Sequence, residues 1–469
     1  MFLKNFENYK IPKFIIVGSG PASISLALRL SSYGQRSLII EAGDSDFSEL
    51  SQSFYEGQTT GHKYYNLSDT RLRQFGGSSN HWGGSSWHLK SYDLRNWPIN
   101  INELNRYNVD SENILNLKLP KIKFFSKNFN KIPNEENMRS NVNFKEKYHE
   151  EIKNSKFIDI IFNTALIKIN NLKNKVNSIT VLSNGKKKNL DINYLILATG
   201  GIENSRILLW SRELSNNSFL KNLPIGNYWM DHPITRPGYF IPSDKYITTY
   251  KDLTLRVEPN IDMLKKNNLN NLAFEFNITE NKDINFKELI RNLLCVAPNI
   301  GQKFMDYFKD YGTLNCVGVI TVSSELEPIF ENKITLSKKH FDKNGVPQCI
   351  LNWNLDNSWR NSIYKNLKIL AEDFIKNDYG RIGIDKLIYD DNVEIPTNRF
   401  FIRGLHHHMG GTRMGFDSTK SVCDNNLKVH NVDNLYLAGS SVFPSSGWAY
   451  PTINIVKLSL KLGDHLNKL

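Results

Sequence analysis

Cysteine is scarce in this sequence of 469 residues, and its four cysteines stand far apart. No two of them form a CxxC pair, and no cluster has the spacing of a zinc site. The sequence therefore excludes a cysteine-built zinc centre, and we expect packed free thiols in a reducing compartment. The four positions are Cys295, Cys316, Cys349 and Cys423.

Long apolar runs are missing as well. No stretch reaches the roughly 20 apolar residues that cross a membrane as a helix. Only 13 residues precede the first expected strand, too few for a signal peptide. We therefore predict a cytoplasmic protein without an integral membrane segment. The formal net charge is +12, but the basic residues form no block, so nucleic acid is not an expected partner.

What the chain does contain is a complete β-turn-α-β unit near its beginning. Phe14–Val17 is an apolar run of buried-strand type, and the glycine-containing turn 18–23 follows it. Helical periodicity then runs over Ile24–Leu30, and Ser37–Ile40 reads as a second strand that ends in Glu41. This order of elements is typical of a dinucleotide-binding unit.

Four residues of this unit have distinct expected tasks. Gly18 permits the tight turn, and Gly20 lets backbone N–H groups approach a pyrophosphate at the helix N-terminus. The small Ser23 allows close packing of helix on strand. Glu41 can accept hydrogen bonds from a ribose and disfavours a 2′-phosphate, so NADP is not expected. The unit predicts an adenine dinucleotide but does not choose between NAD and FAD.

Later segments indicate that the nucleotide-binding domain is discontinuous. Tyr194–Ala198 is another apolar run, and it leads into a second strand–glycine–helix junction at Thr199-Gly200-Gly201. We predict a nucleotide-binding domain over 1–95, 155–234 and 400–469, with 96–154 as a connection or lid. Residues 73–84 are dense in glycine and serine, which suits a loop beside a flat or charged ligand or a plain surface loop.

Residues 235–399 are expected to form a second domain with a mainly antiparallel sheet. Its polar and apolar residues alternate over Leu272–Ile278, Val317–Ser323, Lys333–Leu336 and Cys349–Trp353. Phe286–Tyr311 has an apolar face, for which packing on the sheet is favoured over a lid or membrane-surface helix.

Five segments, in their order along the chain, resemble the glucose–methanol–choline (GMC) flavoprotein oxidoreductases. They are GSGPAS with IIEAG, then GGSSNHWGG, then ATGGIENSRILL, then GNYWMDHP, and finally HMGGTRMG with NLYLAGSSVFP and PT. The nearest branch is that of the pyranose oxidases and sugar dehydrogenases. The resemblance implies an α/β fold, in which a Rossmann-type domain binds FAD and an antiparallel substrate-binding domain, flanked by helices, covers the flavin ring.

The resemblance also implies roles for individual residues. SSNHW resembles the segment in which pyranose oxidases join a histidine covalently to the flavin, which is His81 here. The alternative is a loop histidine beside FAD held without a bond. HMGGTRMG resembles the segment that carries the catalytic histidine, which is His408. His406 and His407 are expected to be supporting or structural, because adjacent side chains on extended backbone point to opposite faces and do not form a three-histidine metal site.

One position departs from the family pattern. The residue directly before the Pro-Thr of the last helix is usually Asn or His, and here it is Tyr450. A phenol donates a hydrogen bond but is a poor base at ordinary pH. Tyr450 therefore orients the substrate hydroxyl, marks a drift away from alcohol oxidation, or is a packing residue.

The expected FAD contacts combine the first unit with the family segments. They are Gly18, Gly20, Pro21, Ala22, Ser23, Glu41, Ala42, Gly77, Ser78, Asn80, His81, Trp82, Ala165, Leu166, Ala198, Thr199, Gly200, Asn204, Gly439, Ser440, Pro451 and Thr452.

The implied activity is oxidation of a CH–OH group in a sugar, polyol or other alcohol. His408 would take the hydroxyl proton, with hydride passing to flavin N5. The substrate is a small molecule, and the expected electron acceptor is not oxygen. Two alternatives stay open: an oxidase that forms hydrogen peroxide, and a GMC-fold flavoprotein that does not oxidise alcohols, for which Tyr450 is the main argument.

Overall fold

The structure is a computed structural model that describes residues 1–215, 219–250, 254–278, 294, 298–307, 318–395 and 402–469. Within these residues a six-stranded parallel sheet has the order β1-β7-β3-β2-β11-β20. Every residue of β2, β3 and β7 is buried, as expected for parallel strands covered on both faces. The strands are β1 (Phe2–Leu3), β2 (Phe14–Val17), β3 (Ser37–Ile40), β7 (Ile158–Ile161), β11 (Tyr194–Leu197) and β20 (Leu435–Leu437).

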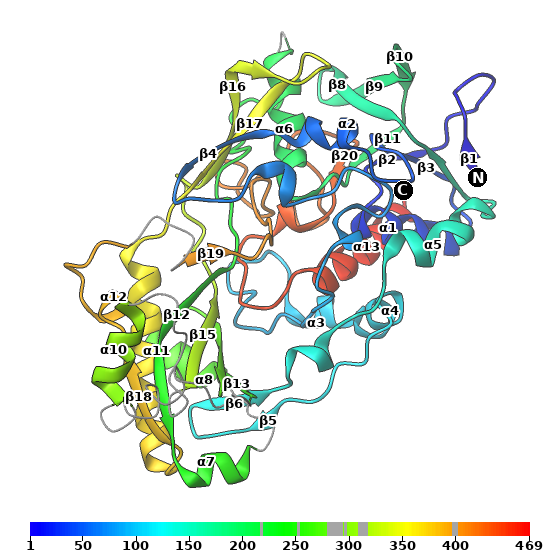
Figure 1. Cartoon of the computed structure of the whole chain (residues 1–469). Coiled ribbons are helices and arrows are strands. Elements are labelled where there is room, and N and C mark those ends of the chain that lie inside the picture. The colour runs from blue at the N-terminus through cyan, green and yellow to red at the C-terminus, as the bar shows by residue number, and fades with distance from the viewer. Residues whose placement is uncertain (216–218, 251–253, 279–293, 295–297, 308–317, 396–401) are drawn as a thin grey trace.

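Two helices far apart in sequence pack together beside this sheet (Figure 1). α1 (Pro21–Ser32) follows β2, and α13 (Thr452–Leu466) ends the chain. Arg29 on α1 forms an ion pair with Asp464 on α13 at 2.6 Å. Because α1 and α13 pack against each other, the first and last segments of the chain meet at one sheet. A third helix, α6 (Gly200–Glu213), follows β11.

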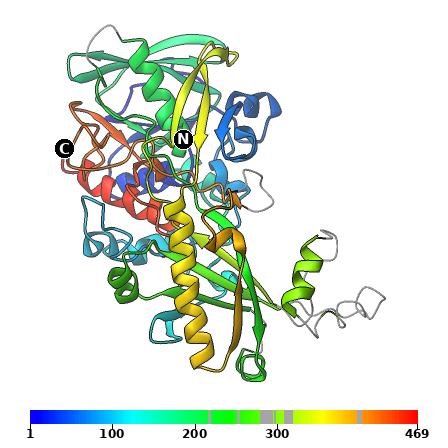
Figure 2. The same cartoon turned by 90° about the vertical axis from the view of Figure 1, so that its left-hand side faces the viewer.

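An eight-stranded antiparallel sheet lies below the parallel sheet in Figure 1. Its order is β18-β12-β15-β14-β13-β6-β5, and β19 pairs with β12. The long helix α11 (Asn357–Lys376) runs along it (Figure 2) and begins at Asp356, which accepts a hydrogen bond from Trp359 N at 3.0 Å. The strands are β5 (Lys123–Phe124), β6 (Phe129–Ile132), β12 (Pro233–Pro242), β13 (Thr254–Pro259), β14 (Leu272–Asn277), β15 (Gly318–Ser324), β18 (Gly380–Ile384) and β19 (Ile402–Gly404).

Two of the four strand segments expected in this sheet lie elsewhere. β16 (Lys333–Phe341) and β17 (Pro347–Trp353) form a three-stranded sheet with β4 (Gly57–Gly61), and β17 pairs with β4 in parallel. The prediction of one antiparallel sheet for all four segments was therefore wrong. Alternation along a strand shows which face is buried, but it does not show which strand is the neighbour.

A second three-stranded sheet and several short helices make up the rest of the described strands and helices. The antiparallel sheet has the order β10-β9-β8, with β8 (Thr164–Leu172), β9 (Lys175–Ser183) and β10 (Lys186–Asp191). The short helices are α2 (Glu49–Gln52), η1 (Ser53–Tyr55), η2 (Leu67–Asp69), η3 (Gly77–Asn80), α3 (Ile101–Asn105), α4 (Asn108–Ile114), η4 (Glu135–Met138), α5 (Phe144–Lys153), α7 (Asp244–Thr249), α8 (Ile261–Asn267), α10 (Pro298–Tyr307), α12 (Lys386–Tyr389) and η5 (Ser440–Val442).

Three expectations about composition can be followed in the structure. Cys349 and Cys423 are buried free thiols, whereas Cys295 and Cys316 lie outside the described residues. Much of Phe286–Tyr311 also lies outside them. The expected packing of its apolar face is wrong for α10, where apolar side chains are exposed. No helix in the described part of the chain is long and apolar enough to span a bilayer.

Candidate active site

A cavity of about 480 Å³ opens at the carboxyl ends of the parallel strands. Val17 of β2, Ile40 of β3 and Ala198 directly after β11 all line it. The carboxyl edge of an open α/β sheet is where such folds bind ligands. The loop that carries His408 and the N-terminus of α13 border the same cavity, so segments from both ends of the chain meet there.

Most of the expected cofactor residues line this cavity, as do His408 and Tyr450. The exceptions are Ser23, Asn80 and Asn204, which support its walls. Ser23 is buried within α1, and Asn80 donates a hydrogen bond to the Phe75 carbonyl at 2.7 Å. Asn204 accepts hydrogen bonds from Thr199 N at 3.0 Å and Oγ1 at 2.7 Å, which fixes the turn into α6.

The turn after β2 leaves room for a ligand at the N-terminus of α1. Gly18 has φ of +97°, and a Cβ there would stand 2.6 Å from the Ala198 carbonyl oxygen. A Cβ on Gly20 would meet nothing within 4 Å, and no side chain caps the helix. The free N–H groups of the first turn therefore border open space, as binding of a pyrophosphate requires.

Glu41 lies at the end of β3 with its carboxylate held in place. Ser19 Oγ donates to Oε2 at 2.6 Å, and Gly43 N donates to Oε1 at 2.7 Å. Glu41 is buried yet lines the cavity. The glycine turn, the uncapped helix and this fixed acid together fit an adenine dinucleotide such as FAD.

His408 lines the cavity, and one of its ring nitrogens has no hydrogen-bond partner among the described residues. Its ring packs between Tyr64 and Trp229, with ring centroids 6.2 and 5.8 Å away. The buried Nε2 atom makes no hydrogen bond to any residue in the described part of the chain. Burial, and next the charge of Arg71, hold the pKa of His408 well below its usual range. The imidazole is therefore neutral at pH 7 and able to accept a proton.

The two histidines before His408 also border the cavity but have different contacts. His406 is exposed, and its ring lies against Tyr65 at 4.2 Å. His407 lines the cavity, and its Nδ1 lies 2.9 Å from Nδ1 of the buried His232. Burial lowers the pKa of His232 to about 4 and that of His407 well below its usual range, so both rings are neutral at pH 7.

Tyr450 closes the cavity beside His407. The two ring centroids are 5.1 Å apart, and Tyr450 is buried. Arg256 Nη2 donates a long hydrogen bond of 3.5 Å to the phenol oxygen, and Arg256 Nε pairs with Glu275 at 3.1 Å. Burial raises the pKa of Tyr450, which keeps the phenol protonated. Tyr450 can thus donate a hydrogen bond into the cavity but does not act as a base.

Comparisons with known proteins agree with this geometry. Residues 328–459 match the family model described as GMC oxidoreductase. The chain is 25% identical over 307 residues to the fructose dehydrogenase large subunit of Gluconobacter japonicus, which covers 62% of this chain and 50% of that protein. It is 41% identical over 64 residues to pyranose 2-oxidase of Tricholoma matsutake, 13% of this chain and 11% of the oxidase. The matched region thus spans about half the length of the fructose dehydrogenase subunit and a smaller share of the pyranose 2-oxidase.

Solved structures show the same fold over the whole chain. Pyridoxine 4-oxidase from Mesorbium loti has a TM-score of 0.58 at 14% identity, covering 98% of this chain and 99% of that one. Formate oxidase has a TM-score of 0.58 at 18% identity, with 98% of each chain covered. The C-terminal part of the chain thus matches the GMC oxidoreductase family model, and the whole chain shares the fold of these oxidases. The expected α/β fold is thereby confirmed.

GMC oxidoreductases are FAD-dependent flavoproteins, and the fit of Gly18, Gly20 and Glu41 agrees with that cofactor. His81 follows η3 and lines the cavity beside Trp82, whose Nε1 donates to the Val142 carbonyl at 3.1 Å. His81 and Trp82, the last two residues of the SSNHW segment, therefore border the space that a flavin could occupy.

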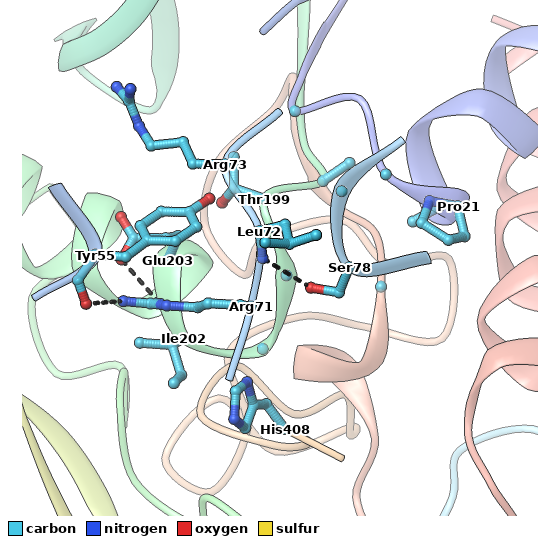
Figure 3. A pocket seen from close by; sticks show the side chains of 18 of the residues that line it. Pro21, Tyr55, Arg71, Leu72, Arg73, Ser78, Thr199, Ile202, Glu203 and His408 are labelled. Atoms are coloured by element: carbon cyan, nitrogen blue, oxygen red, sulfur yellow. Dashed lines mark hydrogen bonds and ion pairs between the residues drawn. The ribbon is translucent and has the colours of Figure 1, made fainter. Parts of the chain in front are cut away.

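Sequence reasoning missed a charged cluster on the cavity wall (Figure 3). Arg71 lies under the ring of Tyr55 at 4.2 Å and pairs with Glu203 at 3.0 Å. Arg206 pairs with Glu203 at 3.2 Å and with Asp342 at 2.6 Å. Burial alone would raise the pKa of Glu203, but Arg206 and Arg71 lower it, so the carboxylate stays ionised.

No spacing rule could have found that cluster, because its members are contributed by η1, the loop before η3, α6 and the turn between β16 and β17. Asp231 was also missed, although it stands in the GNYWMDHP segment. Its contacts are described below.

Proposed function

We propose that this protein is a GMC-type, FAD-dependent dehydrogenase that oxidises a CH–OH group of a sugar, polyol or other alcohol, with an acceptor other than oxygen. The observation that carries the proposal is His408, which lines the cavity, is neutral, and carries a buried Nε2 without a hydrogen-bond partner among the described residues. Two relatives, a fructose dehydrogenase subunit and a pyranose 2-oxidase, are named for sugars.

The cofactor is held, in this proposal, by the expected residues that line the cavity. The first turn of α1 binds the pyrophosphate through N–H groups after Gly20, and Glu41 accepts from the ribose. We propose that 1–95, 155–234 and 400–469 form this domain and 235–399 the substrate domain, joined by 96–154. All six parallel strands come from the first three ranges, while β5 and β6 of the connection extend the antiparallel sheet.

His408 and Tyr450 divide the work on the substrate. FAD, when bound, supplies the acceptor for the electron pair that leaves the carbon. His408 Nε2 takes the hydroxyl proton, because burial keeps the imidazole neutral. The Tyr450 phenol donates a hydrogen bond to the substrate oxygen and is oriented by Arg256.

The N-terminus of α13 adds a fixed positive field. The helix begins behind Pro451, no side chain caps it, and Thr452 lines the cavity. Free N–H groups at a helix start stabilise negative charge that develops nearby, with no reorganisation at the moment of reaction.

Covalent attachment of FAD through His81 is a further proposal. Its support is the position of His81 on the cavity wall. Acid precipitation tests it: a yellow pellet, with the polypeptide heavier by one FAD, is expected. A colourless pellet with flavin in the supernatant would show that FAD is held without a bond.

The function is tested by an anaerobic visible spectrum before and after addition of pooled sugars, polyols and simple alcohols. Bleaching of the flavin band is expected with one pool, followed by recolouring with a quinone. Fast recolouring by air with hydrogen peroxide would favour the oxidase. A band that persists through every pool contradicts alcohol oxidation of these classes and favours a flavoprotein of other chemistry, with Tyr450 as its mark.

A further inference from the structure

The loop before His408 is held by a single buried carboxylate. Asp231 is fully buried and accepts five hydrogen bonds, three of them from consecutive backbone N–H groups. Oδ1 accepts from Leu405 N at 3.2 Å and from His407 N at 2.8 Å, and Oδ2 accepts from His406 N at 3.1 Å. This arrangement satisfies donors that a buried loop would otherwise leave unpaired.

The loop needs such support because its backbone is unusual. His406 has φ of +61°, in the left-handed region that a residue with a side chain rarely occupies. A conformation of this kind costs roughly 1–3 kcal/mol and persists only where the surroundings fix it. The carboxylate of Asp231 binds the N–H groups on both sides of His406 and that of His406 itself.

Asp231 reaches His408 by a second route through Tyr64. The Tyr64 hydroxyl donates to Oδ2 of Asp231, and the Tyr64 ring forms one wall of the His408 environment. On the far side of His408, the backbone of Met409 pairs with Met230, with N–O distances of 2.8 and 2.9 Å. Residues 230 and 231 therefore fix the chain before and after His408.

The close approach of Asp231 to the loop depends on Gly404. A Cβ at that position would stand 2.3 Å from Asp231 Oδ2. No side chain could occupy this space while the carboxylate keeps its five donors.

We propose that Asp231 is the positioning residue of this site: its ionised carboxylate fixes the loop 405–408 and thereby the ring of His408. The inference rests on the proposed role of His408 as the base. It adds that the base is placed by a negative charge, which a neutral residue of the same shape does not replace. An asparagine at this position would direct its own side-chain N–H group toward the backbone N–H groups that donate to Asp231.

This arrangement has a pH signature. Burial raises the pKa of Asp231 to about 6, against the lowering effect of its hydrogen bonds from Tyr64 and the backbone. The titratable groups that face it are Tyr64, whose pKa lies well above its usual value, and the imidazoles of His232 and His407, whose pKa values are lowered. These three are neutral between pH 5 and 8, and so is His408.

Activity and stability should therefore change in opposite directions. As pH falls through about 6, Asp231 takes up a proton, loses acceptor capacity and releases the loop, so the rate of substrate oxidation falls. A carboxyl whose pKa is raised by folding binds its proton more readily in the folded state. Its contribution to stability therefore grows as pH falls from 6 toward the usual value of 3.8. Simple acid unfolding would lower both quantities together.

The test uses the holoenzyme and Asp231→Asn. We expect the rate of flavin reduction at pH 8 to fall on the order of 100-fold, the scale of misplaced catalytic groups. FAD content should be retained, Tm should fall only modestly because some buried donors lose their acceptor, and the inflection near pH 6 should be absent. Tyr64→Phe, which keeps the carboxylate, should move the inflection to higher pH, because the Tyr64 hydrogen bond lowers the pKa of Asp231.

A matched control is Asp373→Asn. Asp373 on α11 is also buried and accepts hydrogen bonds from Ser126 and Asn128. It should leave the rate and the inflection unchanged. A wild-type rate and a wild-type inflection in Asp231→Asn would overturn the proposal. A second contradicting result would be that Asp231→Asn loses FAD and Tm in step with its activity while Tyr64→Phe leaves the inflection unmoved.

A second readout does not depend on turnover. In 15N-histidine NMR spectra, the His408 signal, assigned as the one missing in His408→Ala, should shift in Asp231→Asn and not in Asp373→Asn. An unmoved signal would overturn the positioning role even where no substrate had been found. Failure of the alcohol pools with a shifted signal would instead reject the proposed function alone.

Discussion

The two ends of the cavity are built in different ways. The end that we propose to bind the nucleotide, called the nucleotide end, consists of local backbone: the turn after β2, the first turn of α1 and Glu41 lie within one short stretch. The end that we propose to be catalytic, called the catalytic end, joins distant segments through side chains, since Asp231 binds the backbone of 405–407 and Tyr64 stands against His408. A site formed by local backbone can be recognised from a continuous sequence pattern. A site formed by side chains from distant segments shows only isolated polar residues in the sequence.

If the two ends are separable, removal of the base should stop turnover without releasing the cofactor. We expect His408→Ala to lower the rate of flavin reduction about 10²–10⁴-fold, the usual contribution of a general base. FAD content should stay at one per chain, because the residues of the nucleotide end are untouched. Stopped-flow spectroscopy measures the first quantity and the absorbance ratio the second. A variant that reduces its flavin at the wild-type rate would remove His408 from the mechanism.

The charged cluster at Glu203 lies on the cavity wall and should act on stability. Glu203→Gln leaves Arg71 and Arg206 buried without their shared carboxylate. Removing one partner of a buried ion pair costs about 3–5 kcal/mol of unfolding free energy. Urea unfolding measures this loss.

The exposed pair of Glu372 with Lys376 offers the control. Glu372→Gln should change the unfolding free energy by no more than about 0.5 kcal/mol, because exposed i,i+4 pairs contribute little. Equal effects of the two substitutions would show that the Glu203 cluster does not stabilise the cavity wall.

The sequence predicted the local structure of the nucleotide end for a physical reason. A parallel strand buried on both faces must be apolar, a tight turn needs glycine, and a helix start that binds phosphate must lack a capping side chain. Phe14–Val17 and Ser37–Ile40 are confirmed as strands with the predicted bounds. Ser23, Asn80 and Asn204 belonged to the right segments, but spacing could not show that they face away from the cavity.

The catalytic end could not be predicted in the same way. His408 and Tyr450 were predicted as catalytic residues only because their segments resemble a family, and the residues that contact them were not predicted. Asp231 and Arg256 lie more than 170 residues from the residues they hold. The assignment of β16 and β17 to the wrong sheet has the same cause, because strand pairing depends on long-range contacts that periodicity does not encode.

The close packing of the turn after β2 can be tested by adding one methyl group at Gly18. Gly18→Ala places a Cβ 2.6 Å from the Ala198 carbonyl oxygen at a positive φ. Gly345→Ala shares the positive φ but meets nothing within 4 Å, so it isolates the cost of backbone strain, roughly 1–3 kcal/mol. We expect a larger loss of Tm for Gly18→Ala, together with weaker FAD retention on dilution. Matching losses in the two variants would mean that the turn can relax away from Ala198.

The smallest expected effect concerns Tyr450. Its measurement distinguishes among the three roles considered for this residue. If the phenol donates a hydrogen bond to the substrate, Tyr450→Phe should lower kcat/KM about tenfold, since a hydrogen bond of this kind contributes roughly 0.5–1.5 kcal/mol. Tyr246→Phe is the matched control, because Tyr246 is buried in the antiparallel-sheet core and its hydroxyl has no partner among the described residues.

Burial raises the pKa of Tyr450 above its usual value of 10, so the phenol should cause no loss of activity below pH 10. If Tyr450→Phe matches wild type, Tyr450 is a packing residue and the catalytic end needs only His408 and its supports. If Tyr450→Phe instead gains activity with alcohols, the tyrosine restricts alcohol oxidation. The catalytic end would then have changed its chemistry while the nucleotide end kept its backbone, which is the divergence that two differently built regions permit.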